Sequence, residues 1–195
     1  MARSTLALWT RSLRVLYRRA RHHLLKLDRS RVDVRPLREG DVEVLARLGP
    51  RLPDGTYAQD WQDQCSGRVT MLIAWYDQRP MAVGLVNWAG PRQPPVQIVY
   101  PDCPEIFRLN VLPNYRSMGL GTLLIDEFER LARARGLPHI GLGVTYENPG
   151  AFALYQRLGY GEPAPSDFMD EYDVPQPDGQ IIHHSHKAHF LVKSL

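Results

Sequence analysis

Long apolar runs and metal-binding cysteines are both missing from this chain of 195 residues. No stretch of about 18 apolar residues occurs, which excludes a transmembrane helix. The two cysteines, Cys65 and Cys103, fit no metal-ligand spacing. We expect two reduced, buried thiols in a cytoplasmic protein, with a lone disulfide as the alternative. The length predicts one domain with an appendage, because it is short for two enzymatic domains.

A basic excess outside the first 30 residues is missing as well. Those residues hold eight basic side chains and one acidic side chain, a net charge of +7, and the whole chain has +3, which leaves −4 for the remainder. The remainder therefore lacks the cationic surface that follows a phosphate backbone, and we expect no nucleic-acid partner.

Residues 1–29 have the pattern of a basic amphipathic helix. Arginines interrupt the apolar centre that a signal peptide needs. Three interpretations stay open: contact with an anionic membrane, packing on the rest of the chain or in a homodimer, and disorder or a position upstream of the true start. Packing is favoured, because the apolar stripe would otherwise face water. The stripe consists of Leu6, Trp9, Leu13, Leu16, Ala20, Leu24 and Leu27.

Residues 31–195 read as the folded domain. The alternation and turn signals predict one central mixed sheet, mostly antiparallel and flanked by helices, in the α/β class. Strands are expected at 32–37, 69–76, 81–88, 104–112 and 139–144, with two more between 168 and 195 around Pro177-Asp178-Gly179. Helices are expected at 57–65, 121–135 and 149–158, and one with Val42, Leu45 and Leu48 on its apolar face; 90–95 reads as a proline-rich loop.

The segment Arg116-Ser117-Met118-Gly119-Leu120-Gly121 lies between an expected strand and an expected helix. Backbone N–H groups at a helix start lack intrahelical partners, and the helix dipole adds positive potential there. Glycines let an anion approach the backbone, Arg116 adds a cation, and Thr122 can donate a hydroxyl. The pattern predicts a phosphate site, with a plain strand-to-helix turn as the alternative.

Two longer strings extend this pattern. They are LNVLPNYRSMGLG at 109–121 and NPGAFALYQRLGY at 148–160. In this order, with one helix and one strand between them, they resemble the two signatures of the GNAT superfamily of N-acetyltransferases. The resemblance covers 32–160 in element order, is strongest from 105 to 160, and excludes residues 1–30.

The resemblance implies acetyl transfer from acetyl-CoA, as cosubstrate and without a metal, by direct attack of an amine in a ternary complex. The alternative is a catalytically inactive domain that senses acetyl-CoA or serves as a scaffold. Tyr155 is implied as the acid for the thiolate, with packing on the sheet as its alternative role. The implied cofactor contacts are Leu109, Asn110, Val111, Arg116, Ser117, Met118, Gly119, Leu120, Gly121, Thr122, Asn148 and Tyr155.

Glu105 is a candidate general base, since strand alternation would place Glu105, Phe107, Leu109 and Val111 on one face and several family members carry a glutamate there. A strand-end carboxylate in solvent is the alternative, and Asp102 is a weaker candidate. The histidines at 183, 184, 186 and 189 lack the cysteine or carboxylate partners typical of a metal site.

The acyl acceptor is expected to be a primary amine of a small molecule or peptide. Within the implied fold, residues 49–67 and the terminal hairpin shape its site. The acidic residues between 167 and 178 favour a cationic amine and argue against anionic acceptors.

Overall fold

The computed structural model describes residues 27–163, 166–175 and 180–195. The chain divides into two compact units, Met1–Val32 and Asp33–Leu195. The predicted helix at 1–29 lies outside the described residues, except that Arg29–Arg31 form a short 3₁₀ turn, η1, capped by Asp28. The second unit contains the candidate site.

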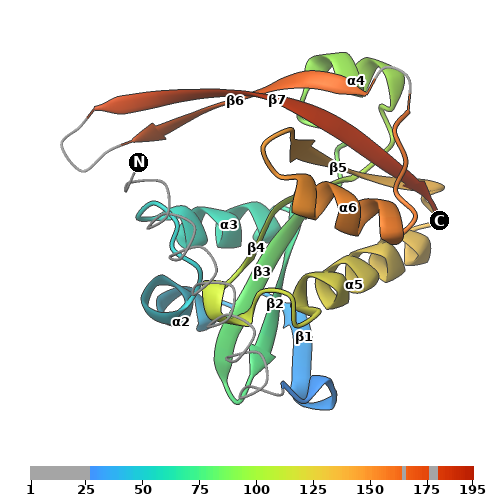
Figure 1. Cartoon of the computed structure of the whole chain (residues 1–195). Helices are drawn as coiled ribbons and strands as arrows, with labels where there is room; N and C mark the ends of the chain where they lie inside the picture. The colour runs from blue at the N-terminus through green and yellow to red at the C-terminus, as the bar shows by residue number, and fades with distance from the viewer. Residues whose placement is uncertain (1–26, 164–165, 176–179) are drawn as a thin grey trace, which may run out of the picture. The chain divides into compact units, whose positions relative to one another are not determined.

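The elements follow the predicted order (Figure 1). They are β1 (Val32–Pro36), α2 (Asp41–Leu48), α3 (Thr56–Cys65), β2 (Val69–Tyr76), β3 (Arg79–Asn87), α4 (Pro94–Val99), β4 (Glu105–Val111), η2 (Pro113–Tyr115), α5 (Leu120–Ala134), β5 (His139–Thr145), α6 (Pro149–Arg157), β6 (Asp167–Pro175) and β7 (Ile181–Ser194).

All the strands join one seven-stranded sheet in the order β1-β2-β3-β4-β5-β7-β6. The pairs β2–β3, β3–β4, β5–β7 and β6–β7 are antiparallel, whereas β4 and β5 are parallel. The prediction of a single mixed, mostly antiparallel sheet is confirmed.

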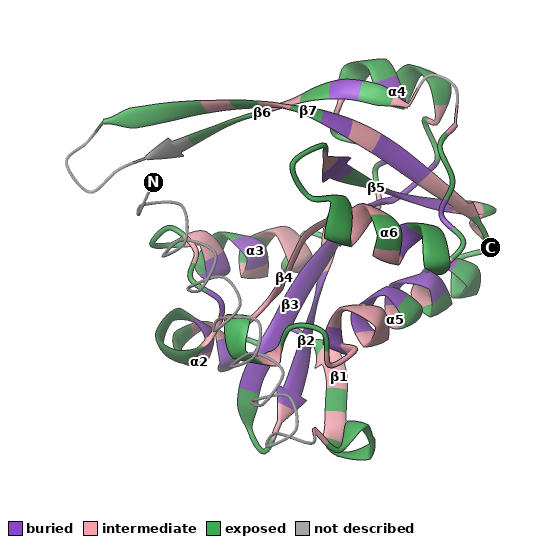
Figure 2. Ribbon diagram, viewed as in Figure 1, coloured by how far each residue is buried: buried purple, intermediate pink, exposed green. Residues whose placement is uncertain are grey.

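Helices cover both faces of the sheet. On one face, Leu45 of α2 and Tyr57 of α3 join a buried cluster with Val83 and Leu85 of β3. Gly84, between those two, faces the other side, where the ring of Phe128 from α5 lies 3.1 Å from the position that a Cβ would take. Figure 2 shows the central strands as the most deeply buried part of the sheet. The core therefore fixes α5 and the pair α2–α3 on opposite faces.

Three local expectations are wrong. The last two residues of the expected loop at 90–95 begin the helix α4, because Pro94 occupies its first position, where a missing N–H costs nothing. Leu48 is 45% exposed at the end of α2. Both cysteines are free thiols, but Cys65 is exposed at the end of α3 and only Cys103 is buried; burial raises the pKa of the Cys103 thiol to about 12.

Within the residues that the structure describes, no helix is long and apolar enough to cross a bilayer.

Candidate active site

The start of α5 offers unpaired backbone donors. Gly119 precedes the helix in the left-handed conformation, with φ of 85°, and no side chain caps the helix. The N–H groups of Leu120, Gly121 and Thr122 have no backbone partner in the described part of the chain. Ser117 also has a positive φ, of 63°. This turn points a row of N–H donors outward, and such a row suits an anionic group.

Two residues of this loop face other directions than the sequence suggested. A Cβ on Gly121 would lie 3.8 Å from Leu109 and 3.9 Å from Val111, so this position packs α5 against β4 and does not line the anion side. Arg116 donates from Nε to the carbonyl oxygen of Val111 over 3.1 Å. The arginine thus links the loop to the end of β4, and its Nη atoms have no hydrogen bond to any described residue.

The sheet opens between β4 and β5. These parallel strands pair at Glu105 with Gly141 and at Ile106 with Leu142, and no further pairing is present between them. The remainder of β4, residues 107–111, pairs with β3 alone along this stretch. Within the described residues, its other edge therefore carries N–H and C=O groups without a strand partner, and an extended ligand could pair with them as an added strand. We call this opening the fork.

A β-bulge in β4 changes which side chains face each side of the sheet. Leu85 pairs with Phe107 and Val83 pairs with Asn110, so β4 has one extra residue between them. Arg108 lies in this bulge with φ of 49°. The predicted shared face is therefore wrong: Glu105 and Phe107 face α3, whereas Leu109 and Val111 face α5.

Glu105 lies beneath an arginine at the start of the fork. Its side chain is 1% exposed, so the alternative of a strand-end carboxylate in solvent is wrong. Oε2 accepts from the backbone N–H and Nε of Arg92, over 2.8 and 3.0 Å, and Oε1 accepts from Nη2 over 3.2 Å. Both carboxylate oxygens are therefore occupied. Asp102, the weaker candidate, is exposed in the preceding turn.

A second arginine–carboxylate pair lies on the same face. Arg108 donates from Nη2 to Oδ1 of Asp60, a residue of α3 whose side chain is 4% exposed. Burial raises the pKa of the Asp60 carboxyl, and the nearby Arg108 guanidinium opposes that rise. The other oxygen, Oδ2, is buried without a partner in the described residues. The guanidinium carbons of Arg92 and Arg108 lie 4.4 and 5.3 Å from the ring centre of Phe107.

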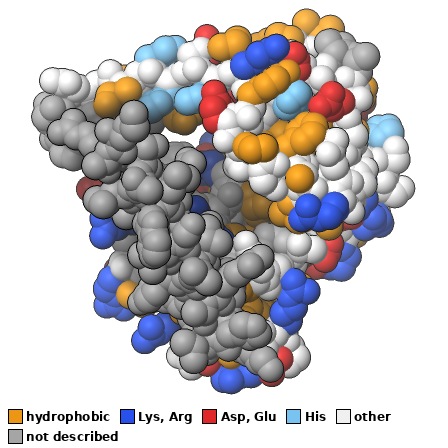
Figure 3. All heavy atoms as spheres, viewed as in Figure 1, with side chains coloured by type: hydrophobic (Ala, Val, Ile, Leu, Met, Phe, Trp, Pro, Cys, Tyr) orange, Lys and Arg blue, Asp and Glu red, His pale blue; other side chains and the backbone are white. Residues whose placement is uncertain are grey.

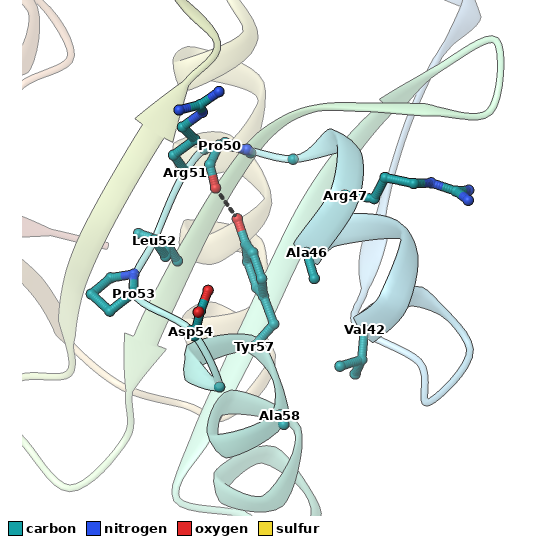
Figure 4. A pocket seen from close by; sticks show the side chains of 12 residues that line it. Val42, Ala46, Arg47, Pro50, Arg51, Leu52, Pro53, Asp54, Tyr57 and Ala58 are labelled. Atoms are coloured by element: carbon teal, nitrogen blue, oxygen red, sulfur yellow. Dashed lines mark hydrogen bonds between the residues drawn. The ribbon is translucent and has the colours of Figure 1, made fainter. Parts of the chain in front are cut away.

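A pocket of about 440 Å³ opens beside the connection between α2 and α3 (Figure 4). The Tyr57 hydroxyl donates to the carbonyl oxygen of Pro50 over 2.5 Å at its wall. Burial and the charge of Asp60 raise the pKa of Tyr57 to about 12. The lining residues are Val42, Ala46, Arg47, Gly49, Pro50, Arg51, Leu52, Pro53, Asp54, Gly55, Tyr57 and Ala58. The pocket thus occupies part of the segment from which an acceptor site was expected.

Helix α6 supplies the other two candidate residues. Asn148 caps the helix, and its side-chain oxygen accepts from the N–H of Ala151 over 3.2 Å. Tyr155 is 8% exposed, and burial raises its pKa to about 12. Its hydroxyl has no hydrogen bond within the described part of the chain. A tyrosine in this state keeps its proton at neutral pH.

The ribbon of β6 and β7 carries the histidines. His184 and His186 lie on one side with Tyr172, and the ring centres are 5.1 to 6.2 Å apart. His183 contacts Asp173 on the other side, over 2.8 Å. His189 is stacked on Tyr146 at 3.9 Å. Figure 3 shows histidine and acidic side chains gathered along this ribbon. The β6–β7 ribbon therefore carries stacked aromatic and imidazole rings on one side and a histidine–aspartate contact on the other.

The sheet order, the fork and the glycine turn at α5 place the chain in the class of GNAT-like α/β folds. The model of the acetyltransferase (GNAT) family matches residues 35–160, more than half of the chain. The chain therefore belongs to the GNAT family, as the two signatures predicted.

Known relatives share parts of the sequence or the fold. An uncharacterized N-acetyltransferase of Methanocaldococcus jannaschii is 41% identical over 58 residues, which are 30% of this chain and 26% of the relative. The ribosomal-protein-S18-alanine N-acetyltransferase of Escherichia coli is similar with a TM-score of 0.58 at 19% identity, over 84% of this chain and 93% of that one. A GNAT acetyltransferase of Elizabethkingia anophelis, solved with acetyl-CoA bound, has a TM-score of 0.54 at 14% identity, over 86% and 100%. At these low identities, the likeness to the two solved structures shows only that this chain has the same fold.

Several residues at the fork were not singled out from the sequence. Arg92 and Asp60 belong to a loop and a helix far from β4 in sequence, so no local spacing relates them to Glu105 or Arg108. The bulge has no glycine or proline to mark it. Only the three-dimensional arrangement brings these groups together.

Proposed function

We propose that this protein transfers an acetyl group from acetyl-CoA to the amine of a small molecule or peptide, by direct attack in a ternary complex. The observation that supports it most is the free row of N–H donors at the start of α5 beside the fork. A diphosphate suits the donors, and a pantetheine arm suits the free edge of β4. The neighbouring structure with acetyl-CoA bound has the same fold.

The proposed roles follow the two signatures. The N–H groups of residues 117–121 hold the diphosphate, with Arg116 and Thr122 beside them, and Leu109 to Val111 hold the pantetheine arm. An N–H near Val111 polarises the thioester carbonyl of the acetyl donor. Asn148 contacts the arm with its amide nitrogen, because its oxygen caps α6. Tyr155 gives its proton to the thiolate that departs from the acetyl group.

The reaction also needs a group that takes the proton from the attacking amine. Glu105 has both oxygens bound to Arg92, which supports an anchoring role for it. We therefore propose that a water chain takes the proton from the amine, with Glu105 as a base remaining a prediction to be tested. A cytoplasmic location, a homodimer and the role of residues 1–29 also remain predictions.

The release of free thiol tests the proposal. Purified protein is incubated with acetyl-CoA and a panel of polyamines, aminoglycoside-like compounds, amino acids and short peptides. Amine-dependent CoA release with a matching acetylated product supports the enzyme. Tight CoA binding without turnover on any amine would instead support the sensor.

A further inference from the structure

We propose that Arg92 and Arg108 form a carboxylate-binding site beside the fork, so that the acceptor is an amine whose molecule also carries a carboxylate. This proposal rests on the proposed function, because it places the acceptor at the fork. It adds a substrate class that the family membership leaves open.

Each of the two guanidinium groups is bound to a buried carboxylate and is itself partly exposed to solvent. Their side chains are 44% and 32% exposed, whereas those of Glu105 and Asp60 are 1% and 4% exposed. Arg92 uses Nε and Nη2 on Glu105, and Arg108 uses Nη2 on Asp60. Among the residues that the structure describes, Nη1 of Arg92 and both Nε and Nη1 of Arg108 have no hydrogen-bond partner. Free N–H donors on a fixed guanidinium match the geometry of a carboxylate.

The bulge in β4 determines on which face of the sheet Arg108 lies. An unbroken strand would alternate Phe107 and Arg108 between opposite faces, so that Arg108 would lie on the α5 side. The bulge turns Arg108 onto the α3 side, beside the Phe107 ring. The residue has φ of 49°, which a residue other than glycine rarely adopts. Such local strain is typical of ligand sites, and a purely structural ion pair would not require it.

Gly143 leaves β5 without a side chain at the fork. Gly143 follows the last residue of β5 that pairs with β4, and it is exposed in mid-strand. A Cβ there would lie 3.1 Å from the ring of Phe168, which packs with α4. The missing side chain would therefore project on the same side of the sheet as Phe107. The ring of Phe168 fills that place, so Gly143 itself adds no side chain toward Arg92 and Arg108.

The charges of the site fit a zwitterion. Each guanidinium is balanced by its own buried carboxylate, so the site offers directed donors and little net charge. Asp170 of β6 accepts a hydrogen bond from Gln93, the residue after Arg92, over 3.0 Å, and its negative charge favours the ammonium end of an approaching molecule. A zwitterionic acceptor keeps the cationic amine that the acidic residues were expected to favour and adds a carboxylate for the two arginines.

Matched acceptors test this site without any mutation. Glycine, β-alanine, 4-aminobutyrate and phenylalanine are each compared with their primary amides, first as acceptors in CoA release and then as ligands of the CoA-loaded protein by calorimetry. We expect at least one carboxylate form to have a KM and a Kd roughly 10- to 100-fold lower than its amide, the usual contribution of charged hydrogen bonds.

Variants then locate the discrimination. Arg108→Gln should abolish most of the difference between acid and amide, and Arg108→Lys should restore part of it. Because Arg108→Gln leaves a buried carboxylate unpaired, the double variant with Asp60→Asn is measured as well. The control is Arg130→Gln on α5, since Arg130 forms an exposed pair with Glu127; it should keep the full difference.

The outcomes separate the two proposals. No preference for any acid over its amide in the wild-type protein, or the same preference in the Arg108 variants, overturns the carboxylate site. Preferential binding of an acid without turnover on any amine retains the site and rejects the acetyltransferase. Turnover with equal use of acids and amides supports the acetyltransferase and rejects the carboxylate site.

Discussion

Replacing Gly119 with glutamate changes the one residue that both shapes the turn before α5 and lies beside its free donors. Gly119 has φ of 85°, and a side chain at such a backbone angle costs about 1–2 kcal/mol of stability. Gly119→Ala carries this cost without a charge, so it is the matched control. Any additional loss in Gly119→Glu reports the charge.

The expected size of the charge effect follows from Coulomb's law. A carboxylate roughly 7 Å from each phosphate, at an effective dielectric constant of about 20 and physiological salt, opposes binding by about 1 kcal/mol per phosphate charge. The two phosphates of the diphosphate together give about 2 kcal/mol. That corresponds to roughly 30-fold weaker binding of CoA.

Calorimetry with two ligands checks this reasoning. CoA should bind roughly 30-fold more weakly to Gly119→Glu than to Gly119→Ala, whereas pantetheine, which lacks the diphosphate, should bind both equally. Thermal melting should show that both variants fold. Equal CoA affinity in the two folded variants would reject the assignment of the diphosphate to this turn.

Three further predictions concern other parts of the unit. Tyr155→Phe should lower kcat roughly 10- to 100-fold with little change in acetyl-CoA affinity; because burial raises the Tyr155 pKa to about 12, wild-type kcat should not fall as pH rises through about 10, the ordinary tyrosine value. Glu105→Gln should lower the melting temperature, because it weakens the hydrogen bonds between residue 105 and Arg92, while the pH profile of kcat/KM should keep its shape. If the rising limb of kcat/KM at acid pH disappears in this variant, Glu105 is the base. Lys193→Met should cost about 2 kcal/mol in urea unfolding, because the buried Glu129 loses both 2.8 Å contacts with Lys193 but keeps Arg133 and Tyr160 as donors, and Glu129→Gln in the same chain should recover part of the loss.

Much of the fold could be predicted because each element has a local signal. The helix α5 has a regular apolar stripe, with Leu124 and Phe128 buried one turn apart. The hairpin of β2 and β3 turns at Asp77 and Gln78, which both have positive φ. α4 was missed because Pro94 signals both a loop and a helix start, and only packing of Val96 against Phe190 selects the helix.

The proposed cofactor side of the site has a recognisable sequence pattern for a related reason. The loop from Arg116 to Gly121 is contiguous, so a backbone site leaves a contiguous pattern in the sequence. The acceptor side is built from Arg92, Asp60 and Arg108, which come from a loop, a helix and a strand. Contacts of this kind depend on the sheet register, and the register is not encoded in any short string.

The bulge at Arg108 shows how one extra residue changes the interpretation of a strand. Strict alternation placed Glu105 and Val111 on one face and suggested a base directed at the thioester. With the bulge, Glu105 and Phe107 face α3 while Leu109 and Val111 face α5. The strand thus presents Leu109 and Val111 toward the proposed cofactor side, and Glu105 and Phe107 toward the proposed acceptor side. Its backbone edge beyond Ile106, which has no strand partner within the described residues, lies between the two sides. One strand can therefore hold both substrates of a direct transfer, provided that its alternation is broken at the point where they meet.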